Sequence, residues 1–525
     1  MTLLDVFSHL SNGGADLPLH GVLASRQIEL ALQAGLPVQT LMRRAGLSVA
    51  RLALALAPDA DRIWIACGPG NNGGDGFEAA ALLQRAGKEV HVSALGDANR
   101  RSADAAAALR CAQDAGVRIE AGANDAAAAA SGLAIDALLG LGHRASSGGN
   151  LASEIVAALR IFNGRPTPRL AIDLPTGLDA ERGTCCDAAA QATETVSLLT
   201  LKPGLFTAQG RDHAGRVWFD GLGAAAAPMD THSDSAKAFV AGGAGAARLR
   251  DAPRRHQQHK GSFGDVVVVG GAPGMAGAAL LAARAALRAG AGRVYVCLLD
   301  PAAPALDAAW PELMLRPDHW RAPDVLATAT VVCGCGGGPA IAAALPLLLS
   351  RTARLVLDAD ALNAVAADPA LQTLLAARAA RGWPTVLTPH PLEAARLAGL
   401  PNAAAIQADR LREAQDLAER WRCIVLLKGS GSVIAAPGLA PRINASGNAR
   451  LASAGTGDVL AGWLGGLWSA FGVHPSVLGL QGLVQAACWL HGRAAEADAP
   501  PGDVARARPS RHTLSASTLI GRLSL

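Results

Sequence analysis

The sequence predicts an α/β protein of two domains, each built around a parallel β-sheet with helices on both faces. Its 525 residues exceed what one hydrophobic core usually supports. In both halves short apolar runs alternate with longer Ala- and Leu-rich stretches of helical period, which is typical of parallel sheets. Residues 221–250 interrupt this pattern with Ala, Gly and small polar residues. We therefore expect domains at residues 1–225 and 250–525, joined by a linker at 226–249.

The expected strands are apolar runs bounded by polar or turn-forming residues. In the first half they are residues 62–66, 89–94, 133–139, 169–174, 194–201 and 216–219. A helix is expected at residues 77–86, because Gly87 is a natural C-terminal cap. In the second half the expected strands are residues 265–269, 293–299, 330–332, 354–357, 385–387 and 423–427. Helices are expected there at residues 276–289, 458–470 and 481–495.

The composition argues against several classes of protein. The net charge is +4 and aromatic residues make up 3%, with no basic cluster among them, so we expect no nucleic-acid partner. The N-terminus lacks the pattern of a signal peptide and no apolar run reaches membrane length, so we expect no membrane attachment. The nine cysteines form no matched CxxC pairs, which argues against structural zinc. We expect reduced thiols and a cytoplasmic location.

A glycine-rich segment, CGPGNNGGDGF at residues 67–77, follows the first expected strand. Its five glycines let the backbone turn sharply and approach a ligand closely. A helix beginning after Asp75 would direct its N–H groups at the same space, where they favour an anionic group. The alternative is that the glycines serve only tight packing. The GxGxxG pattern is not cleanly met, because Gly73 is followed by GDG rather than by a helix, which disfavours an ordinary dinucleotide-dependent dehydrogenase.

Two further strand ends carry carboxylates. Asp136 lies in the expected strand 133–139, and Asp173 lies in the expected strand 169–174. Ligands of parallel sheets bind beyond the carboxyl ends of the strands, so these groups and the glycine-rich segment are expected to share one crevice. Each aspartate alone could instead cap a loop.

Together these segments resemble the epimerase domain of the NAD(P)H-hydrate repair family. The resemblance rests on GPGNNGGDGF, DALLGLG and AIDLPTGLDAERG, with LPVQTLMRRAG before them and LKPGL after them, over about residues 15–225. It implies a Rossmann-like parallel-sheet sandwich that binds hydrated NADH or NADPH. The residues implied in binding are Asn71, Asn72, Gly73, Gly74, Asp75, Gly140, Leu141, Gly142, His143, Arg144, Ala145, Ser146 and Asp173.

The same resemblance implies a potassium ion held by Asn72, Asp136 and Thr176, where the family usually has Ser at the last position. Epimerising a hemiaminal carbon beside a ring nitrogen needs little beyond a proton donor, a proton acceptor and a held intermediate. We therefore expect Asp173 to act as the acid/base, with assistance from Lys202. A lysine at a strand end is more often solvated or ion-paired, and this alternative stays open for Lys202.

In the second half, ASAGTGDVLAG at residues 452–462 predicts an anion-binding turn. Gly455, Thr456 and Gly457 can direct successive N–H groups into one concavity at the start of a helix. Asp458 lies at its rim, where it could accept the proton of a hydroxyl that is being phosphorylated. The alternative is an ordinary acidic residue at a helix N-terminus. Other expected strand ends carry further polar groups, namely Asp358, Asp360, His390, Glu393 and Lys428.

The GTGD turn resembles the ribokinase-like kinases. The full set of HKGSFGDVVVVGGAPGMAGAA, DADALN, TPHPLE, KGSG and AGTGDVLAG is closer to the NAD(P)H-hydrate dehydratase domain, over about residues 250–515. The resemblance implies a ribokinase-like α/β domain that binds ADP, with magnesium on its phosphates. Residues implied in nucleotide binding are Lys428, Gly429, Ser430, Gly431, Ser432 and Gly457. Residues implied in binding the hydrated cofactor are Ala278, Gly338, His390 and Asp458.

Two details of this second resemblance concern single residues. Glu393 is our candidate for holding magnesium through a water molecule. Where the family usually reads GPGLG, this chain reads GCGGG at residues 334–338, so the loop before Gly338 lacks the usual Pro and Leu.

The sequence therefore predicts a bifunctional repair enzyme for hydrated NADH and NADPH. The first domain would epimerise the R and S hydrates. The second would phosphorylate the S hydrate with ADP and eliminate phosphate, releasing AMP and phosphate. One rival is a kinase for a vitamin-type alcohol fused to a nucleotide-binding module, and another is a first domain that only binds a ligand or a partner protein. We also expect a homo-oligomer.

Overall fold

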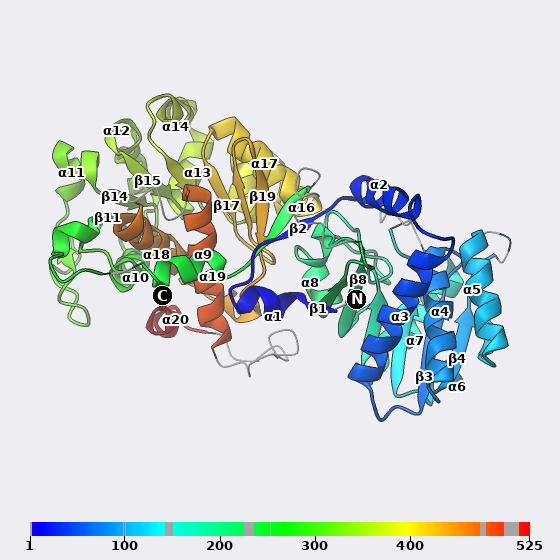
Figure 1. Ribbon diagram of the computed structural model, residues 1–525. Coiled ribbons are helices and arrows are strands. Elements are labelled where there is room, and N and C mark those ends of the chain that lie inside the picture. Colours follow the sequence, from blue (N-terminus) through cyan, green and yellow to red (C-terminus); the bar gives the residue numbers. More distant parts are fainter. Residues whose placement is uncertain are drawn as a thin grey trace. The chain divides into compact units, whose positions relative to one another are not determined.

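The computed structural model describes residues 3–97, 99, 101–141, 151–224, 236–252, 254–472, 479–497 and 514–525 (Figure 1). The chain forms two compact units, of which the first comprises residues 1–9 and 17–240 and the second residues 10–16 and 241–525. Each unit alternates strands with helices around its own sheet, which confirms the α/β class predicted from sequence. In the described ranges no helix has both the length and the apolar character needed to span a membrane.

An eight-stranded sheet forms the centre of the first unit, in the order β1-β9-β8-β7-β6-β3-β4-β5. Its strands are β1 (Leu4–Asp5), β3 (Arg62–Cys67), β4 (Glu89–Ala94), β5 (Arg118–Ala121), β6 (Leu133–Ala137), β7 (Arg169–Ile172), β8 (Glu194–Leu198) and β9 (Arg216–Asp220). All neighbouring pairs are parallel except β1 and β9. The carboxyl ends of β3, β6 and β7 therefore lie at one edge of the sheet.

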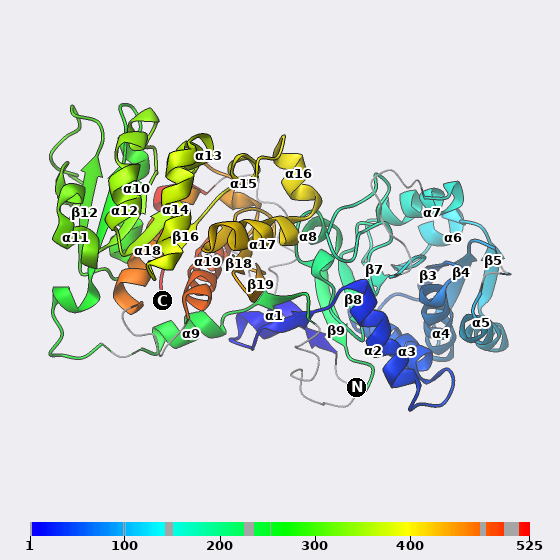
Figure 2. The ribbon, with the colours of Figure 1, turned by 90° about the horizontal axis from the view of Figure 1, so that it is seen from above.

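Helices cover both faces of this sheet. They are α2 (Val22–Gln33), α3 (Thr40–Leu56), α4 (Asn71–Arg85), α5 (Ala103–Asp114), α6 (Asp125–Ala129), α7 (Ser153–Asn163) and α8 (Gly210–His213), with a 3₁₀ turn η2 (Pro203–Leu205). Alternate residues of β3 point to opposite faces, so Ile63 and Ile65 pack with α3, α4 and α5, whereas Trp64 and Ala66 pack with α7. Figure 2 shows α3, α4 and α5 on one side of the strands and α6 and α7 on the other.

The start of α4 differs from the sequence prediction. The helix was expected at residues 77–86, but it begins at Asn71, so the NNGGDG segment is helical rather than a turn. A Cβ on Gly73 would lie 1.9 Å from the Gly68 carbonyl oxygen, and one on Gly76 would lie 2.6 Å from Ala137 Cβ. These glycines let the first turns of α4 pack closely against the strand ends. Their helix penalty of about 1 kcal/mol each made the segment look like a loop.

The sheet of the second unit runs in the order β13-β12-β11-β14-β15-β16-β17-β18-β19. Its strands are β11 (Asp265–Gly270), β12 (Arg293–Leu298), β13 (Met314–Leu315), β14 (Thr330–Cys333), β15 (Arg354–Leu357), β16 (Thr385–Leu387), β17 (Ile424–Leu427), β18 (Val433–Ala436) and β19 (Leu439–Asn444). The strands from β13 to β17 are parallel, and β18 and β19 add an antiparallel hairpin.

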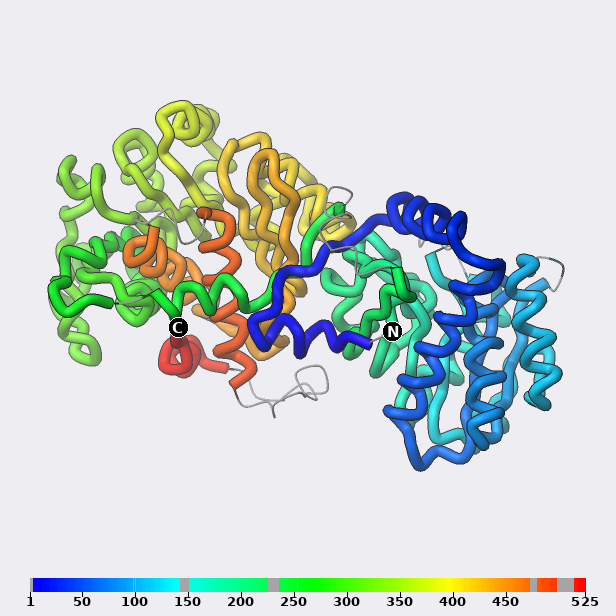
Figure 3. The backbone as a smooth tube through the Cα atoms, viewed as in Figure 1, coloured from blue at the N-terminus to red at the C-terminus, as the bar shows by residue number. Residues whose placement is uncertain are grey.

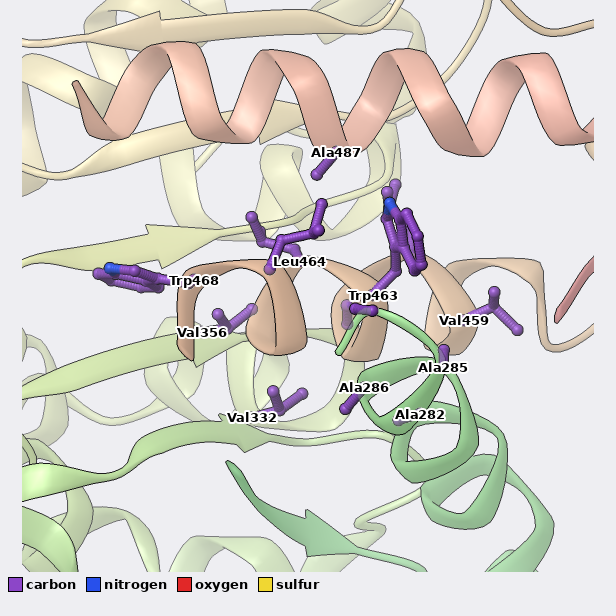
Figure 4. Packing of buried hydrophobic residues seen from close by; sticks show 14 of the residues in the cluster. Ala282, Ala285, Ala286, Val332, Val356, Val459, Trp463, Leu464, Trp468 and Ala487 are labelled. Atoms are coloured by element: carbon purple, nitrogen blue, oxygen red, sulfur yellow. The ribbon is translucent and has the colours of Figure 1, made fainter. Parts of the chain in front are cut away.

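The helices of this unit flank its sheet, and α18 (Thr456–Phe471) is buried in the core. The helices are α9 (Ala244–Arg250), α10 (Ala276–Arg288), α11 (Pro323–Thr328), α12 (Leu345–Arg351), α13 (Ala359–Ala367), α14 (Pro369–Ala380), α15 (Pro391–Ala398), α16 (Ala403–Ala408), α17 (Arg410–Trp421), α18 (Thr456–Phe471), α19 (Leu480–Glu496) and α20 (Ala516–Arg522). Short 3₁₀ turns are η4 (Lys260–Phe263), η5 (His319–Arg321), η6 (Pro339–Ala343) and η7 (Ala449–Leu451). In Figure 4, Leu464 of α18 lies between Ala487 of α19 and Val356 of β15.

Two segments near the predicted linker carry regular structure. Strands β2 (Leu17–Leu19) and β10 (Ala238–Ala241) pair antiparallel, and α9 begins three residues after β10. Residues 10–16, which follow the start of α1 (Val6–Ser11), belong to the second unit, where Asp16 accepts hydrogen bonds from Gln485 Nε2 at 2.9 Å and from the Gly242 N–H at 2.9 Å. Asp16 is also ion-paired with Arg442. In Figure 3, residues 10–16 are part of the dark blue tube next to the second unit, to which they belong.

Candidate active sites

A cleft of about 770 Å³ lies at the carboxyl ends of the strands in the first unit. Of the residues predicted from sequence, its lining includes Asn71, Asn72, Asp75, Gly140, Leu141 and Asp173. Asp173 and the glycine-rich segment therefore share one cleft, as expected of parallel strand ends, whereas Asp136 is fully buried and does not line it. Gly73 and Gly74 are not among the lining residues, because they face the Gly68 carbonyl and the Met42 side chain. Gly142, His143, Arg144, Ala145 and Ser146 lie outside the described residues.

Asp173 and Lys202 form a buried ion pair at this cleft. The Lys202 side chain is 1% exposed and that of Asp173 is 13% exposed. Lys202 Nζ also donates to the Leu198 carbonyl oxygen at 2.9 Å, and the Leu198 N–H donates to Asp173 Oδ1 at 3.2 Å. Asp173 has a φ of 65°, a conformation that costs a non-glycine residue about 1–3 kcal/mol. The fold therefore holds this carboxylate in one place against a conformational preference, as at many functional sites.

Asp136 and Thr176 form a second buried group beneath the same cleft. The Thr176 hydroxyl donates to Asp136 Oδ1 at 2.8 Å, and the Thr176 N–H donates to Oδ2 at 2.8 Å. Leu139 links this pair to the cleft, because its N–H lies 3.0 Å from the Thr176 hydroxyl. Burial raises the pKa of Asp136 to about 6, although these hydrogen bonds act in the opposite direction.

Asn72 lies at the neighbouring strand end, in the first turn of α4. Its side chain is buried, and its Nδ2 has no hydrogen-bond acceptor among the described residues. A Cβ on Gly140 would lie 3.4 Å from Asn72 Oδ1, so Asn72 borders the segment that Leu139 connects to Thr176. Asn72 and the Asp136–Thr176 pair thus both border residues 139–140.

Two acidic residues with raised pKa values, Asp75 and Glu29, line the cleft. Burial raises the pKa of Asp75 well above its ordinary value, and Asp173 and Glu29 act in the same direction. Burial and then Asp173 also raise the pKa of Glu29. Sequence reasoning missed Glu29, since it lies in α2, outside every recognised motif. An acidic residue in an amphipathic helix carries no local signal of a site.

The second unit collects its polar groups at the carboxyl ends of β15, β16 and β17. Lys428 Nζ lies 2.6 Å from Asp358 Oδ1, which also accepts from the Thr388 hydroxyl at 2.8 Å. Burial opposes the charge of Lys428, but Asp358 and Glu393 raise its pKa. A Cβ on Gly457 would lie 3.4 Å from Lys428 Nζ, so the KGSGS and GTGD motifs meet here.

Asp458 lies in the first turn of α18. The helix begins at Thr456, after Gly455, whose φ of 84° suits glycine. Burial, then repulsion by Asp358, raises the pKa of Asp458 to about 6, while a hydrogen bond with the Cys335 thiol acts in the opposite direction. Ligand atoms of Cys335, Asp358 and Asp458 lie within 4.8 Å of one another. The ammonium group of Lys428 already supplies positive charge to this cluster.

Hydrogen bonds from neighbouring segments hold the GCGGG loop at residues 334–338. Cys335 and Gly336 accept hydrogen bonds through their carbonyl oxygens from Gly271 at 3.0 Å and Ala272 at 2.7 Å. Gly338, with a φ of 52°, donates its N–H to Asp360 Oδ2 at 2.8 Å. Sequence reasoning did not foresee that Cys335, in place of the usual proline, would contact Asp458.

His390 and Glu393 form a capping box at the start of α15. The Leu392 N–H donates to His390 Nδ1 at 3.1 Å, and the His390 N–H donates to Glu393 Oε2 at 2.8 Å. Glu393 Oε1 lies 3.1 Å from His390 Nε2. Both oxygens of Glu393 therefore have a partner on His390. The His390 side chain is 46% exposed, which leaves its outer face accessible to a ligand.

The fold and these two sites define a two-unit α/β enzyme in which each unit has its own largely parallel sheet. Residues 266–506 match the family model described as NAD(P)H-hydrate dehydratase, and residues 38–204 match the one described as YjeF-related protein N-terminus. The chain belongs to the family of bifunctional NAD(P)H-hydrate repair enzymes. The resemblance found in the sequence is thereby confirmed.

Three known proteins illustrate this relationship. The chain is 36% identical to the bifunctional NAD(P)H-hydrate repair enzyme Nnr of Escherichia coli (strain K12), over 82% of this chain and 81% of that protein. It is 35% identical to the enzyme of the same name from Moorella thermoacetica, over 87% of this chain and 86% of that protein. Among solved structures, ADP/ATP-dependent NAD(P)H-hydrate dehydratase from Bacillus subtilis is 27% identical, with a TM-score of 0.43, and covers 53% of this chain and 94% of its own.

Proposed function

We propose that this chain repairs hydrated NADH and NADPH with two separate active sites. The first unit epimerises the R and S hydrates, and the second dehydrates the S hydrate with ADP. The observation that carries this proposal is that each unit places its own acid/base group at the carboxyl edge of its own sheet. These groups are Asp173 beside Lys202 and Asp458 beside Lys428. Family membership over both halves supports the pairing of the two activities.

In the dehydratase site, Asp458 acts as the base. It accepts the proton of the hydrate hydroxyl while that oxygen attacks the β-phosphorus of ADP, and AMP leaves. The C–O bond then breaks with phosphate as the leaving group, and loss of a proton from the adjacent carbon restores the double bond. Lys428 and the N–H groups of residues 455–457 stabilise the phosphate charges. Ala278, Gly338 and His390 are the proposed contacts with the hydrated cofactor.

Magnesium, when bound, would neutralise the charge of the nucleotide phosphates. Because both oxygens of Glu393 already have His390 as a partner, Glu393 fits a water-mediated role better than direct coordination. The nucleotide itself is proposed to bind at the turn formed by Lys428, Gly429, Ser430, Gly431 and Ser432, next to Gly457.

In the epimerase site, Asp173 transfers the proton, and Lys202 holds the Asp173 carboxylate in place through the ion pair. The hydrated nicotinamide would occupy the cleft between Asn71 and Asp75 on one side and Gly140 and Leu141 on the other. Asp75, whose raised pKa favours its protonated form, can donate a hydrogen bond to a hydroxyl of the substrate.

A potassium ion fits beside this cleft. Asp136 is a fully buried carboxylate with a raised pKa, so a cation next to it would offset the cost of its charge. Rotation of the unpartnered Asn72 amide by 180° would present Oδ1, and the Thr176 hydroxyl supplies a third oxygen. Such a set of oxygen ligands is the donor chemistry that hard cations prefer. The ion would supply positive charge close to the bound substrate.

We also propose a cytoplasmic location and a homo-oligomer. All nine cysteines are free thiols, as expected in a reducing compartment. Light scattering of the purified protein measures the oligomeric state directly.

The test is an absorbance assay at the reduced-nicotinamide band, with purified protein and a mixture of both hydrate epimers. It is run with ADP, with ATP and without nucleotide. Full, nucleotide-dependent recovery of the reduced cofactor supports both activities. Recovery that stops at one epimer contradicts the epimerase assignment and leaves the dehydratase. A stable phosphate ester without inorganic phosphate would instead support the vitamin-type kinase.

A further inference from the structure

Arg410 is a buried arginine directly beneath the turn that joins β17 and β18. It is the first residue of α17, and its exposed fraction is 0%. Burial of a guanidinium group is costly unless its N–H groups are satisfied, so such a residue is retained for the contacts it makes. None of the sequence motifs included it.

The contacts of Arg410 converge on the backbone of this turn. Its Nη2 donates to the carbonyl oxygens of Leu427 at 3.3 Å, Lys428 at 3.2 Å and Gly431 at 3.5 Å. Its Nη1 donates to Gln407 Oε1 at 2.7 Å. One guanidinium group thus fixes three peptide planes, two before the tip of the turn and one after it.

Gly429 packs over the same guanidinium group. It has a φ of 135°, and a Cβ at this position would lie 3.0 Å from Arg410 Nη1 and 3.1 Å from Nη2. Any side chain here would push the turn away from the arginine. The contact with Arg410 therefore explains why position 429 of the KGSGS motif is a glycine.

The charge of Arg410 is retained in this environment. Burial lowers its pKa to about 10, so the guanidinium group stays protonated at neutral pH. Lys428, whose carbonyl oxygen it binds, carries the second positive charge of the turn. The turn thus carries two cationic groups, of which Lys428 is paired with Asp358 and Arg410 binds the backbone carbonyl oxygens.

We propose that Arg410 is a positioning residue for the β17–β18 turn, holding it in the conformation that binds a nucleoside diphosphate and adding a buried positive charge beneath the phosphates. This inference rests on the proposed role of the turn in ADP binding. It extends that role to a residue that contacts the turn rather than the nucleotide.

Arg378 offers a matched control in the same unit. It is also buried, at 1% exposed, and burial likewise lowers its pKa to about 10. It donates to the Thr385 hydroxyl at 2.7 Å and to the Leu349 carbonyl oxygen at 3.0 Å. Thr385 begins β16, at the end of the strand opposite to the site. Arg378 is therefore also a buried and hydrogen-bonded arginine, but these hydrogen bonds lie outside the β17–β18 turn.

The experiment compares Arg410→Met, Arg410→Lys and Arg378→Met in the full-length enzyme. ADP affinity is measured by calorimetry, the KM for ADP and for the hydrate and kcat by absorbance, and stability by thermal melting. Both methionine variants should melt earlier. Only Arg410→Met should weaken ADP binding, by roughly tenfold or more, because it loses several hydrogen bonds that hold the turn. The KM for the hydrate should stay unchanged, and Arg410→Lys should recover part of the ADP affinity.

Two outcomes would overturn the proposal. One is equal ADP affinity in Arg410→Met and Arg378→Met, and the other is an equal rise in KM for both substrates. If Arg410→Met does not fold, Gly429→Ala is the second variant, and unchanged ADP affinity in it contradicts the packing argument. A wild-type enzyme that binds no ADP would contradict the proposed function itself. Binding by the wild type with an unaffected Arg410→Met contradicts this inference alone.

Discussion

Lys202 is ion-paired with Asp173 even though the Lys202 side chain is only 1% exposed and Asp173 has a left-handed backbone conformation. A buried pair of this kind is usually neutral or costly for stability compared with apolar residues. Its position at the cleft therefore points to a role in chemistry. It also makes the two residues interdependent, because removal of either one leaves an uncompensated charge.

The first prediction concerns this pair. Asp173→Asn should lower epimerisation by at least ~100-fold, the usual contribution of an acid/base residue. Dehydration of the pure S hydrate should be unchanged, because that reaction belongs to the other unit. Lys202→Met should destabilise the first unit by about 3–5 kcal/mol by leaving Asp173 unpaired. The double variant should recover part of that stability. Full epimerase activity in Asp173→Asn, followed by exchange between the two epimers, would contradict the assignment.

The second prediction concerns potassium. If the ion binds at Asp136, the first unit should have a higher melting temperature in potassium than in tetramethylammonium. Its free energy of unfolding should increase by about 2.7 kcal/mol when the ion is at 100 times its Kd. Asp136→Asn should remove the effect. Thr176→Ser keeps the hydroxyl that donates to Asp136 and should retain it, whereas Thr176→Val should not. An equal response of all four proteins to potassium would exclude this site.

The third prediction concerns the pH dependence of the dehydratase. Asp458 can accept a proton only when it is ionised, and its pKa is raised to about 6. The value of kcat/KM, which reports ionisations of the free enzyme, should therefore be constant above that pH and fall about tenfold per pH unit below it. Cys335→Ala removes the hydrogen bond that lowers this pKa, so the fall should begin at a higher pH. Cys333→Ala is the control, since Cys333 is equally buried but is outside the cluster with Asp458. The same profile in both variants would contradict the role of the thiol.

The fourth prediction concerns the packing of α18 on α10. A Cβ on Gly462 would lie 1.9 Å from the Ala282 carbonyl oxygen, so Gly462→Ala must push the two helices apart. Such overpacking costs about 1–3 kcal/mol, and backbone contact places this case at the upper end. Gly277→Ala, where a Cβ meets nothing within 4 Å, should be neutral or slightly stabilising. Chemical denaturation measures both, and equal stabilities would show that α18 can shift freely.

Local pattern placed most of the strands but only a minority of the helices. Strands β4, β15 and β16 have the bounds predicted from sequence, because each is a short run with buried Val or Leu residues that turn-forming or helical segments flank. The start of α4 was missed, since helix propensity penalises the glycines that packing against Gly68 and Ala137 requires. Strand β19 was also missed, because its exposed and buried residues mix without a clear apolar run.

The residues of the candidate sites also fall into two groups, those that the sequence could propose and those that it could not. Asp136, Asp173, Lys428 and Asp458 could be proposed from sequence, because each lies in a short motif at a strand or helix end. Glu29, Cys335 and Arg410 could not, since their contacts join segments distant in sequence.

The sequence by itself determined the α/β class, the order of most strands, and the family of this protein, because these depend on local periodicity and short motifs. Only the tertiary structure decided which residues meet at each site. The burial of Lys202 beside Asp173, the thiol of Cys335 beside Asp458 and the guanidinium of Arg410 beneath the turn all depend on contacts across the sheet. Those contacts also set the desolvation that raises the pKa of Asp136 and Asp458, and no local pattern encodes it.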